Sequence, residues 1–212
     1  TTTTTTDDDA STTLYVPSDE CHSVDDLFEQ LTELGGLTWS IKKINNVVVA
    51  AGVHQINHMA EDADGASFTG LYLKGPHYEK LTIRGETDSS GALLTIFSGG
   101  LVLITGEDAH DIFLEELAIN NGDQAGWRSW MGNGLYVDDG AHEIRATRCS
   151  FFQCEKLGVF VGDIGTSVVL TDCKFYGNKR GGVMASEGGK VDVIGAYTEI
   201  YDNEKFGMFS YM

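Results

Sequence analysis

The sequence predicts an all-β chain that winds into a parallel solenoid, with three short strands per coil and one capping α-helix near the N-terminus. An internal repeat carries this prediction, because residues 142–161 align with residues 166–185 almost without gaps. Cys149 then matches Cys173. A third copy follows one residue out of step, and its equivalent positions are Thr198, Ile200, Asn203, Gly207 and Met208. A fixed period of this size is typical of stacked supersecondary units.

Within each repeat, apolar residues two apart mark about three short strands, and the turns between them are too short for a crossover helix. Consecutive hairpins in a propeller or a sandwich would also use short turns. Positions that recur once per repeat instead favour strands stacked in register on those of the next coil. Connections between parallel strands are right-handed in nearly all sheets, so we expect a right-handed parallel β-helix over residues 23–212.

One amphipathic helix is predicted over residues 23–34. Ser23 is a suitable N-terminal cap, two Asp residues follow in the first turn, and a Gly pair ends the helix. Its apolar residues recur at helical spacing, and they are Val24, Leu27, Phe28, Leu31 and Leu34. Residues 1–22 begin with a run of Thr and Asp, so we expect a disordered or linker-like lead-in there.

Short apolar runs then recur along the chain from residue 46 onward, separated by Gly, Asp, Asn and Ser, the residues that favour turns. Residues 112–137 join the repeat, but their spacing is longer than in the later copies. The difference indicates an insertion near residues 121–132. Insertions in solenoids map to loops on one face, which is often a binding face.

The order of elements resembles a known family. A helix, the strand Val47–His54 and coils of the type Cys173-Lys-Phe-Tyr-Gly-Asn178 are together similar to the pectin-lyase-like superfamily of right-handed parallel β-helix proteins. The resemblance is closest to repeats of carbohydrate-binding and sugar-hydrolase modules, and it extends from Ser23 to the C-terminus. It implies that the helix plugs the N-terminal end of the coil.

No corresponding cap is visible at the C-terminal end. Residues 207–212 fall inside an expected strand. Terminal repeats normally need a cap, so we expect either a longer chain or a partner over this edge, and we favour the longer chain.

The composition narrows the classes of partner. The formal net charge of -18 excludes a binder of phosphate backbones and disfavours polyuronates and anionic membranes. No run is long and apolar enough to span a bilayer. Four cysteines without a CxxC pair give no disulfide framework and no zinc site. The compartment stays open.

The insertion supplies the first candidate site. Trp127, Arg128 and Trp130 lie within it, and Tyr136 follows on the next strand. Aromatic faces beside an Arg suit sugar stacking or a hot spot for a protein partner. The alternative is that both Trp side chains fold back over the coil as a lid.

A second candidate is a group of acidic and imidazole side chains. Asp138, Asp139 and His142 lie close together, and Asp163 occupies the following coil. If the protein is an enzyme, these are candidates for acid and base catalysis, and the carboxylates are candidates for holding Ca²⁺. The alternative is an ordinary Asp-Asp-Gly turn. No metal or other cofactor is predicted otherwise.

Two rows of equivalent residues are interpreted as structural and not as catalytic. Cys149 and Cys173 are expected to point inward one coil apart, and Asn178 and Asn203 are expected to hydrogen-bond along the stack. A small basic row is also predicted on one turn, from Lys156, Lys179 and Arg180.

The sequence thus favours a non-catalytic interaction or scaffold module of a larger assembly, with a protein partner at the loop of residues 121–132 and at the open C-terminal edge. Two alternatives remain. One is a polysaccharide lyase, hydrolase or epimerase that uses the carboxylates. The other is a sugar-binding module for an extended glycan that uses the Trp residues without chemistry.

Overall fold

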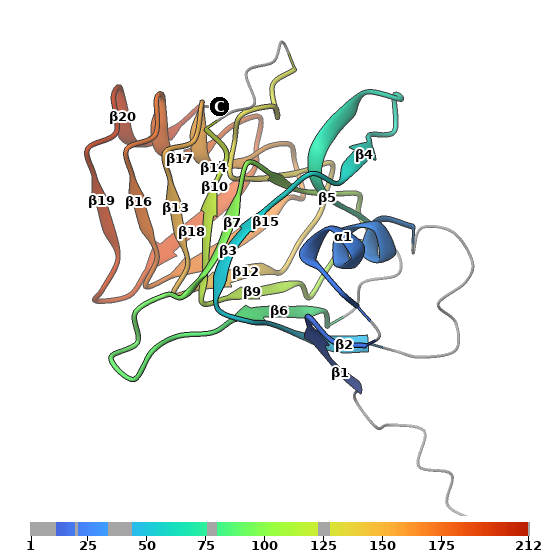
Figure 1. Ribbon diagram of the computed structural model, residues 1–212. Coiled ribbons are helices and arrows are strands. Elements are labelled where there is room, and N and C mark those ends of the chain that lie inside the picture. The colour runs from blue at the N-terminus through green and yellow to red at the C-terminus, as the bar shows by residue number, and fades with distance from the viewer. Residues whose placement is uncertain (1–11, 20, 34–43, 76–79, 123–127, 212) are drawn as a thin grey trace, which may run out of the picture.

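The computed structural model describes residues 12–19, 21–33, 44–75, 80–122 and 128–211. Their strands stack into a prism with three sheets along its length, and this confirms the predicted parallel β-helix (Figure 1). Every strand pairing is parallel except that between β4 and β5, which form a hairpin. A coil therefore contributes one strand to each sheet before the chain enters the next coil.

The strands of each sheet are as follows. Sheet 1 contains β1 (Thr12–Val16), β2 (Ile44–Val49), β6 (Thr82–Gly85), β9 (Phe113–Glu115), β12 (Ile144–Thr147), β15 (Ser167–Thr171) and β18 (Lys190–Ile194). Sheet 2 contains β3 (Gly52–Gln55), β7 (Thr95–Ser98), β10 (Leu117–Asn120), β13 (Ser150–Phe152), β16 (Lys174–Tyr176) and β19 (Glu199–Tyr201). Sheet 3 contains β4 (Met59–Glu61), β5 (Ser67–Lys74), β8 (Leu101–Thr105), β11 (Leu135–Asp138), β14 (Leu157–Val161), β17 (Gly181–Ala185) and β20 (Phe206–Ser210).

The first strand lies earlier than the sequence indicates. β1 falls within the stretch assigned to the lead-in, and it pairs in parallel with β2 at the edge of sheet 1. Leu14 and Val16 alternate inward from β1 and are buried. The preceding residues 1–11 lie outside the described part of the chain.

The sequence repeat corresponds to structural register. Phe151 pairs with Phe175, and their inward rings stack with centroids 5.6 Å apart. Cys149 and Cys173 are buried in the coil as predicted, and each thiol donates to a backbone carbonyl of the preceding coil. Residues two apart on every strand thus fill one continuous core, where each large apolar side chain contributes roughly 1.5–3 kcal/mol of burial free energy.

The corners between sheet 1 and sheet 2 are made by one residue per coil in the left-handed region. Glu116, Arg148 and Asp172 have φ values of 57°, 51° and 53° at equivalent positions. A single residue in this conformation turns the backbone sharply enough for the next strand to follow at once. The turns therefore hold no crossover helix, as the sequence indicates.

An asparagine row stabilises the corner between sheet 2 and sheet 3, as predicted. The Asn178 side-chain oxygen accepts a hydrogen bond from the Cys154 backbone at 2.9 Å, and the Asn203 oxygen accepts from the Asn178 backbone at 3.1 Å. The Asn178 amide nitrogen also donates to Asn203 at 2.9 Å. Each asparagine thus satisfies the backbone of the coil that precedes it.

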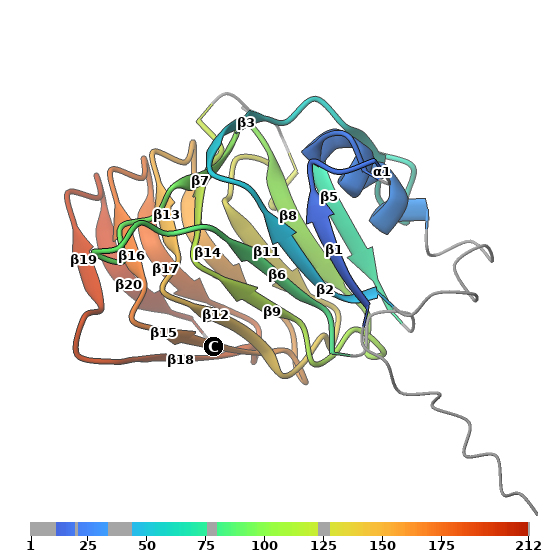
Figure 2. The same ribbon diagram turned by 60° about the horizontal axis from the view of Figure 1, so that its bottom comes forward.

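Helix α1 (Val24–Glu33) covers the N-terminal end of the coil, next to β5 (Figure 2). Its cap forms as predicted, because the Ser23 hydroxyl accepts a hydrogen bond from the Asp26 backbone at 3.0 Å. The apolar stripe faces the coil, and the Phe28 ring meets Phe97 edge-on at 5.5 Å. The Asp25 carboxylate accepts from the backbone of Asn57 and His58 at 2.8 and 3.0 Å.

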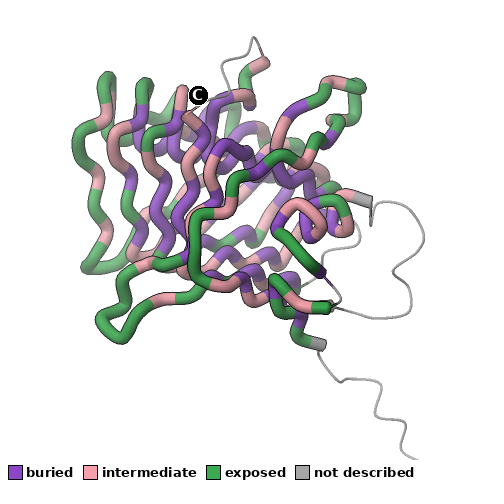
Figure 3. The backbone as a smooth tube through the Cα atoms, viewed as in Figure 1, coloured by how far each residue is buried: buried purple, intermediate pink, exposed green. Residues whose placement is uncertain are grey.

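The opposite end is formed by β18, β19 and β20, and we call it the terminal edge. Figure 3 shows exposed residues gathered there. Met208 on β20 is exposed, whereas its equivalent one coil earlier, Val183, is buried. Large apolar side chains are solvent-exposed on this coil, namely Ile194, Tyr197, Tyr201, Met208, Phe209 and Tyr211.

Candidate functional site

The described residues 128–132 of the insertion fold back over the outer face of sheet 3. Trp130 is only 7% exposed, and its ring lies 4.9 Å from that of Phe68 on β5. A second apolar cluster forms there, outside the coil, and consists of Ala60, Phe68, Tyr72, Leu101, Leu103, Trp130 and Tyr136. The face of Trp130 is therefore used by the fold, as the lid alternative expects. Trp127 lies outside the described residues.

Polar contacts fasten the same loop at both sides. The Arg128 guanidinium binds the Asp64 carboxylate on the β4–β5 hairpin at 3.1 Å. The Lys156 ammonium donates to the Arg128 carbonyl at 2.6 Å. Arg128 thus joins the loop to the hairpin, and Lys156 joins it to the next coil. The contacts of Arg128 are structural ones, and the aromatic pair predicted for sugar stacking is not presented on the described surface.

Tyr136 lies under this lid with its hydroxyl directed at Asp138. The phenol donates to an Asp138 carboxylate oxygen at 2.8 Å and lies 3.4 Å from the Ser129 hydroxyl. Its ring stacks on Phe160 of the next coil at 4.5 Å. Burial raises the pKa of Tyr136 well above its usual value, so the phenol stays protonated and remains a donor.

Asp138 and Asp163 lie on neighbouring coils, near enough for the Asp163 carboxyl group to act on the pKa of Asp138. Burial raises the pKa of Asp138 to about 6, the hydrogen bond from Tyr136 opposes the rise, and the Asp163 carboxyl adds to it. Burial and the neighbouring carboxyl group thus both disfavour the ionised form of Asp138. Gly162 makes room for the pair, since a side chain there would begin 2.8 Å from an Asp138 oxygen.

A shallow acidic depression lies beside this pair. It has a volume of about 330 Å³ and is lined by Glu107, Asp139, Gly140, Asp163, Ile164 and Glu187. The last three acidic residues occupy one turn of successive coils, with φ values of 57°, 58° and 54° for Asp139, Asp163 and Glu187. The depression thus follows the coil stack and carries negative charge along its length. It repels anionic sugars at close range.

His142 does not join the carboxylates around this depression. Its Nδ1 lies 3.2 Å from the Gly140 carbonyl, and its ring stacks on His110 at 5.3 Å. The His110 ring in turn lies 3.3 Å from the Asp111 carboxylate. Of the four predicted catalytic candidates, Asp139 and Asp163 share the depression, Asp138 lies behind it and His142 belongs to the adjacent turn.

This arrangement limits the chemistry. Glycoside hydrolysis needs two carboxyl groups across one bond, and both Asp138 oxygens already accept hydrogen bonds, one from the Tyr136 hydroxyl and one from the Asp139 backbone. Among the residues that the structure describes, no group of three or more His, Cys, Asp or Glu side chains is placed to hold a metal ion. No described helix has the length and apolar character needed to cross a membrane.

The predicted basic row changes its membership in the structure. Lys179 binds the Glu155 carboxylate, so its charge is matched. Arg180 follows Lys156 along the stack, and Lys205 follows Arg180, because each backbone N–H bonds the carbonyl of its equivalent one coil earlier. The row is therefore Lys156, Arg180 and Lys205, which the one-residue slip of the third repeat conceals.

Two further features were not singled out from the sequence. Asp64 and Phe68 hold the lid, but nothing in a local pattern links residue 64 to residue 128. Glu187 was detectable in principle, because it lies one period after Asp163.

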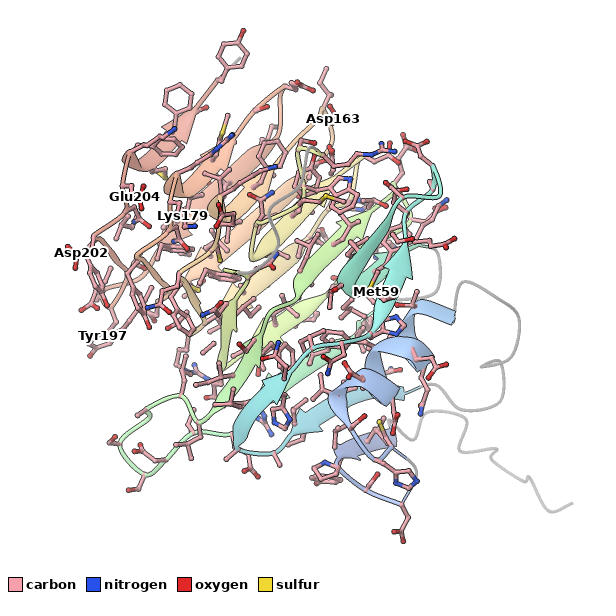
Figure 4. The ribbon with its side chains drawn as sticks, turned by 45° about the horizontal axis from the view of Figure 1, so that its top comes forward. Met59, Asp163, Lys179, Tyr197, Asp202 and Glu204 are labelled. Carbon is pink, nitrogen blue, oxygen red and sulfur yellow. The ribbon has the colours of Figure 1, made fainter. Side chains whose placement is uncertain are left out.

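The terminal edge is the other candidate site. A groove of about 420 Å³ runs between β18 and β20, with Val191, Met208 and Phe209 in its lining and Lys190 and Asp192 at its sides. Figure 4 shows that Tyr197, Asp202 and Glu204 lie together at this end, well apart from Asp163. Apolar side chains and unpaired strand backbone are exposed here together, a combination that favours pairing with another chain.

Comparison with known proteins identifies a family by its profile. The profile described as the right-handed beta helix region matches residues 42–198. No curated protein and no solved structure shows significant similarity to the chain.

Proposed function

Because the chain belongs to this right-handed β-helix family, we propose that it is a non-catalytic interaction module of a larger assembly, which docks a partner on the terminal edge. The observation that carries the proposal is the exposure of Met208, which fills a position that is buried in the preceding coils at Val183, Val159 and Leu135. Three residues that the sequence marks as candidate site residues support the same view, because Arg128, Trp130 and His142 contact other parts of the fold.

A matched pair of substitutions tests whether the terminal edge is free in the isolated chain. Met208 pairs with Val183 one coil earlier, so the two positions are equivalent. We expect Met208→Asp to lower the free energy of unfolding by less than about 1 kcal/mol, and Val183→Asp to lower it by more than about 4 kcal/mol. The wild type should also bind a hydrophobic fluorescent dye in its native state, and Met208→Asp should bind less of it.

An equal loss of stability in both variants would mean that Met208 serves the fold as Val183 does, and the docking role would then fail. Turnover would also overturn the proposal. The test is release of reducing ends or unsaturated uronates from a polysaccharide panel, with and without Ca²⁺. We expect none.

One observation favours a second function, that of a carbohydrate-active lyase, hydrolase or epimerase. Asp138 is a carboxyl group whose pKa is raised to about 6, a value suited to proton transfer near neutral pH. In that case the polysaccharide assay should show activity, and both Asp138→Asn and Asp163→Asn should abolish it. A sugar-binding role for the inserted loop has less support, because Trp130 is buried.

A further inference from the structure

An apolar row runs along the outer face of sheet 3, with one residue from each coil. In chain order the row consists of Tyr72, Leu103, Tyr136, Phe160 and Met184, and each residue pairs in register with the next. The first three are buried, because they belong to the outer cluster that also contains Phe68 and Trp130. The last two are only partly buried. The row therefore continues beyond the described elements that cover it.

Phe160 and Met184 are exposed on the side of the solenoid and not at one of its ends. β14 lies between β11 and β17, and β17 lies between β14 and β20, so both residues have a paired strand on each side. A further coil at either end of the solenoid would not cover their outward side chains. We call the outer surface of β14 and β17 the lateral strip.

Two cations stand at the end of the lateral strip where its strands begin. Lys156 directly precedes β14, Arg180 directly precedes β17, and the Arg180 backbone N–H donates to the Lys156 carbonyl at 2.8 Å. Burial lowers the pKa of Lys156, and the positive charge of Arg180 lowers it further. Neither side chain forms an ion pair within the described part of the chain. This end of the strip therefore attracts a negatively charged group.

Carboxylates stand at the opposite end of the lateral strip, where the same strands finish. Asp139, Asp163 and Glu187 line the acidic depression from successive coils. Ile164 lines the same depression and is 85% exposed. Figure 4 shows Asp163 at this end of the strands and Lys179, the neighbour of Arg180, at the other. An aliphatic side chain among carboxylates suits the methylene stem and charged head of a Lys or Arg.

The dimensions of the lateral strip match those of a short α-helix. Two strands about 4.8 Å apart give a strip roughly 10 Å wide, and a helix with its side chains is about 10–12 Å across. β14 has five residues, so the two charged ends of the strip lie roughly 16 Å apart. A helix of about 11 residues spans this distance. A helix that lies along the strands therefore places its two ends over opposite charges.

We propose that the lateral strip binds a short amphipathic helix of another protein, with acidic side chains at one end, basic side chains at the other and apolar side chains between them. The acidic end meets the two cations, the basic end meets the row of carboxylates, and the apolar centre covers Phe160 and Met184. This surface is additional to the terminal edge, and the inference does not depend on docking there.

A second copy of this chain does not match the lateral strip. In the part of the chain that the structure describes, the helix is α1, which has acidic but no basic side chains and already packs its apolar stripe into the coil. Two strips can match their opposite charges face to face only about a two-fold axis along the solenoid. That axis also brings residues 128–132 of both copies together, and these two layers hold the strips apart.

A synthetic helix tests the proposal on the full chain. The probe is a fluorescent peptide of about 14 residues, held helical by a side-chain staple, with Glu in its first turn, Leu along one face of its centre and Lys in its last turn. Fluorescence anisotropy at physiological ionic strength measures its binding. We expect saturable binding to the wild type. Met184→Asp should weaken it at least about tenfold, because a carboxylate would then face the leucines.

Two further variants show which contacts are responsible. Val169→Asp is the matched control, because Val169 is an outward, partly buried strand residue on sheet 1, and it should leave binding unchanged. Arg180→Glu changes an exposed charge. It should weaken binding of the probe at least about tenfold, and it should strengthen binding of a second peptide that has Lys at both ends. Thermal unfolding of each variant confirms that it is folded.

Three results would overturn the inference. One is the absence of saturable binding to the wild type, and another is equal binding to the wild type and Met184→Asp. The third is a dimer of the free chain that Met184→Asp dissociates, since the occupant would then be a second copy. None of these measurements involves Met208, so failure of docking at the terminal edge is recognised separately by the Met208→Asp variant.

Discussion

The two ends of the solenoid are built from similar residues but differ in environment. At the N-terminal end, α1 lies over the coil, and Phe28 is 1% exposed. At the terminal edge, Met208 continues an equally apolar row and is 58% exposed. The pattern of residues is therefore not what buries a side chain in a solenoid. A neighbouring layer does so, and at the N-terminal end that layer is a helix.

The difference also concerns the backbone. α1 brings the Asp25 carboxylate to the backbone N–H groups of Asn57 and His58. The helix thus covers apolar surface and also accepts hydrogen bonds from the chain beneath it. At the terminal edge, the corresponding groups of β18 to β20 face outward. A cap for this fold must satisfy polar groups as well as apolar ones.

The largest expected effect comes from emptying the interior under the helix. Phe28→Ala should lower the free energy of unfolding by about 3–5 kcal/mol, because it leaves a cavity against Phe97. Met208→Ala, the matched change at the terminal edge, should cost less than about 1 kcal/mol. Chemical denaturation of both variants gives the two values. Similar costs at both ends would contradict the comparison.

The next largest loss of stability is expected from substitutions in the asparagine row. Asn178 lies in an inner coil and Asn203 in the last one, so the two substitutions compare these coils. Asn178 bonds coils on both sides, whereas Asn203 bonds only the preceding one. Asn178→Ala should cost about 2–4 kcal/mol because it leaves buried backbone groups without partners. Asn203→Ala should cost about half as much, as measured by thermal unfolding. The reverse order would show that the row does not act through the following coil.

A smaller effect is expected from the polar anchor of the helix. Asp25→Ala removes the acceptor for two backbone donors, and it should cost about 1–2 kcal/mol. Hydrogen exchange at Asn57 and His58 should accelerate at the same time. Asp26→Ala is the neighbouring control, with unchanged exchange at those two positions.

The smallest expected effect concerns Asp138, in the middle of the solenoid. Unlike the effects expected at the two ends, it depends on pH. The pKa of Asp138 is raised from 3.8 to about 6, so its contribution to stability is fully present below pH 4 and is lost as the pH rises through 6. Because the group is partly solvated, we expect a loss on the order of 1 kcal/mol between pH 4 and pH 7.5.

Denaturation of Asp138→Asn at a series of pH values measures this contribution. The variant should lack that component of the wild-type pH profile, because its side chain no longer ionises. Asp139→Asn controls for the loss of one surface charge. Parallel profiles for the wild type and Asp138→Asn would contradict the raised pKa of Asp138.

The sequence by itself determined the architecture. The repeat that aligns Phe151 with Phe175 is the register of the sheets, because a solenoid places residues one period apart directly over each other. Helix α1 and the Asn178 to Asn203 row follow from equally local signals, a cap with an apolar stripe and one amide per period. Residues 12–16 were missed as a strand because five residues next to a run of Thr and Asp give little periodicity.

Only the tertiary structure decided what the candidate residues do. Trp130 is buried because Phe68, far away in the sequence, lies beneath it. Arg128 binds Asp64 on the β4–β5 hairpin, which is not part of the sequence repeat. Asp138 lies near Asp163 of the next coil and accepts a hydrogen bond from Tyr136, whereas His142 stacks on His110 instead. Periodicity predicts contacts between equivalent positions of successive coils. It does not predict contacts between an insertion and the surface that the insertion covers. The fold could therefore be predicted from the sequence, whereas the contacts made by the candidate site residues could not.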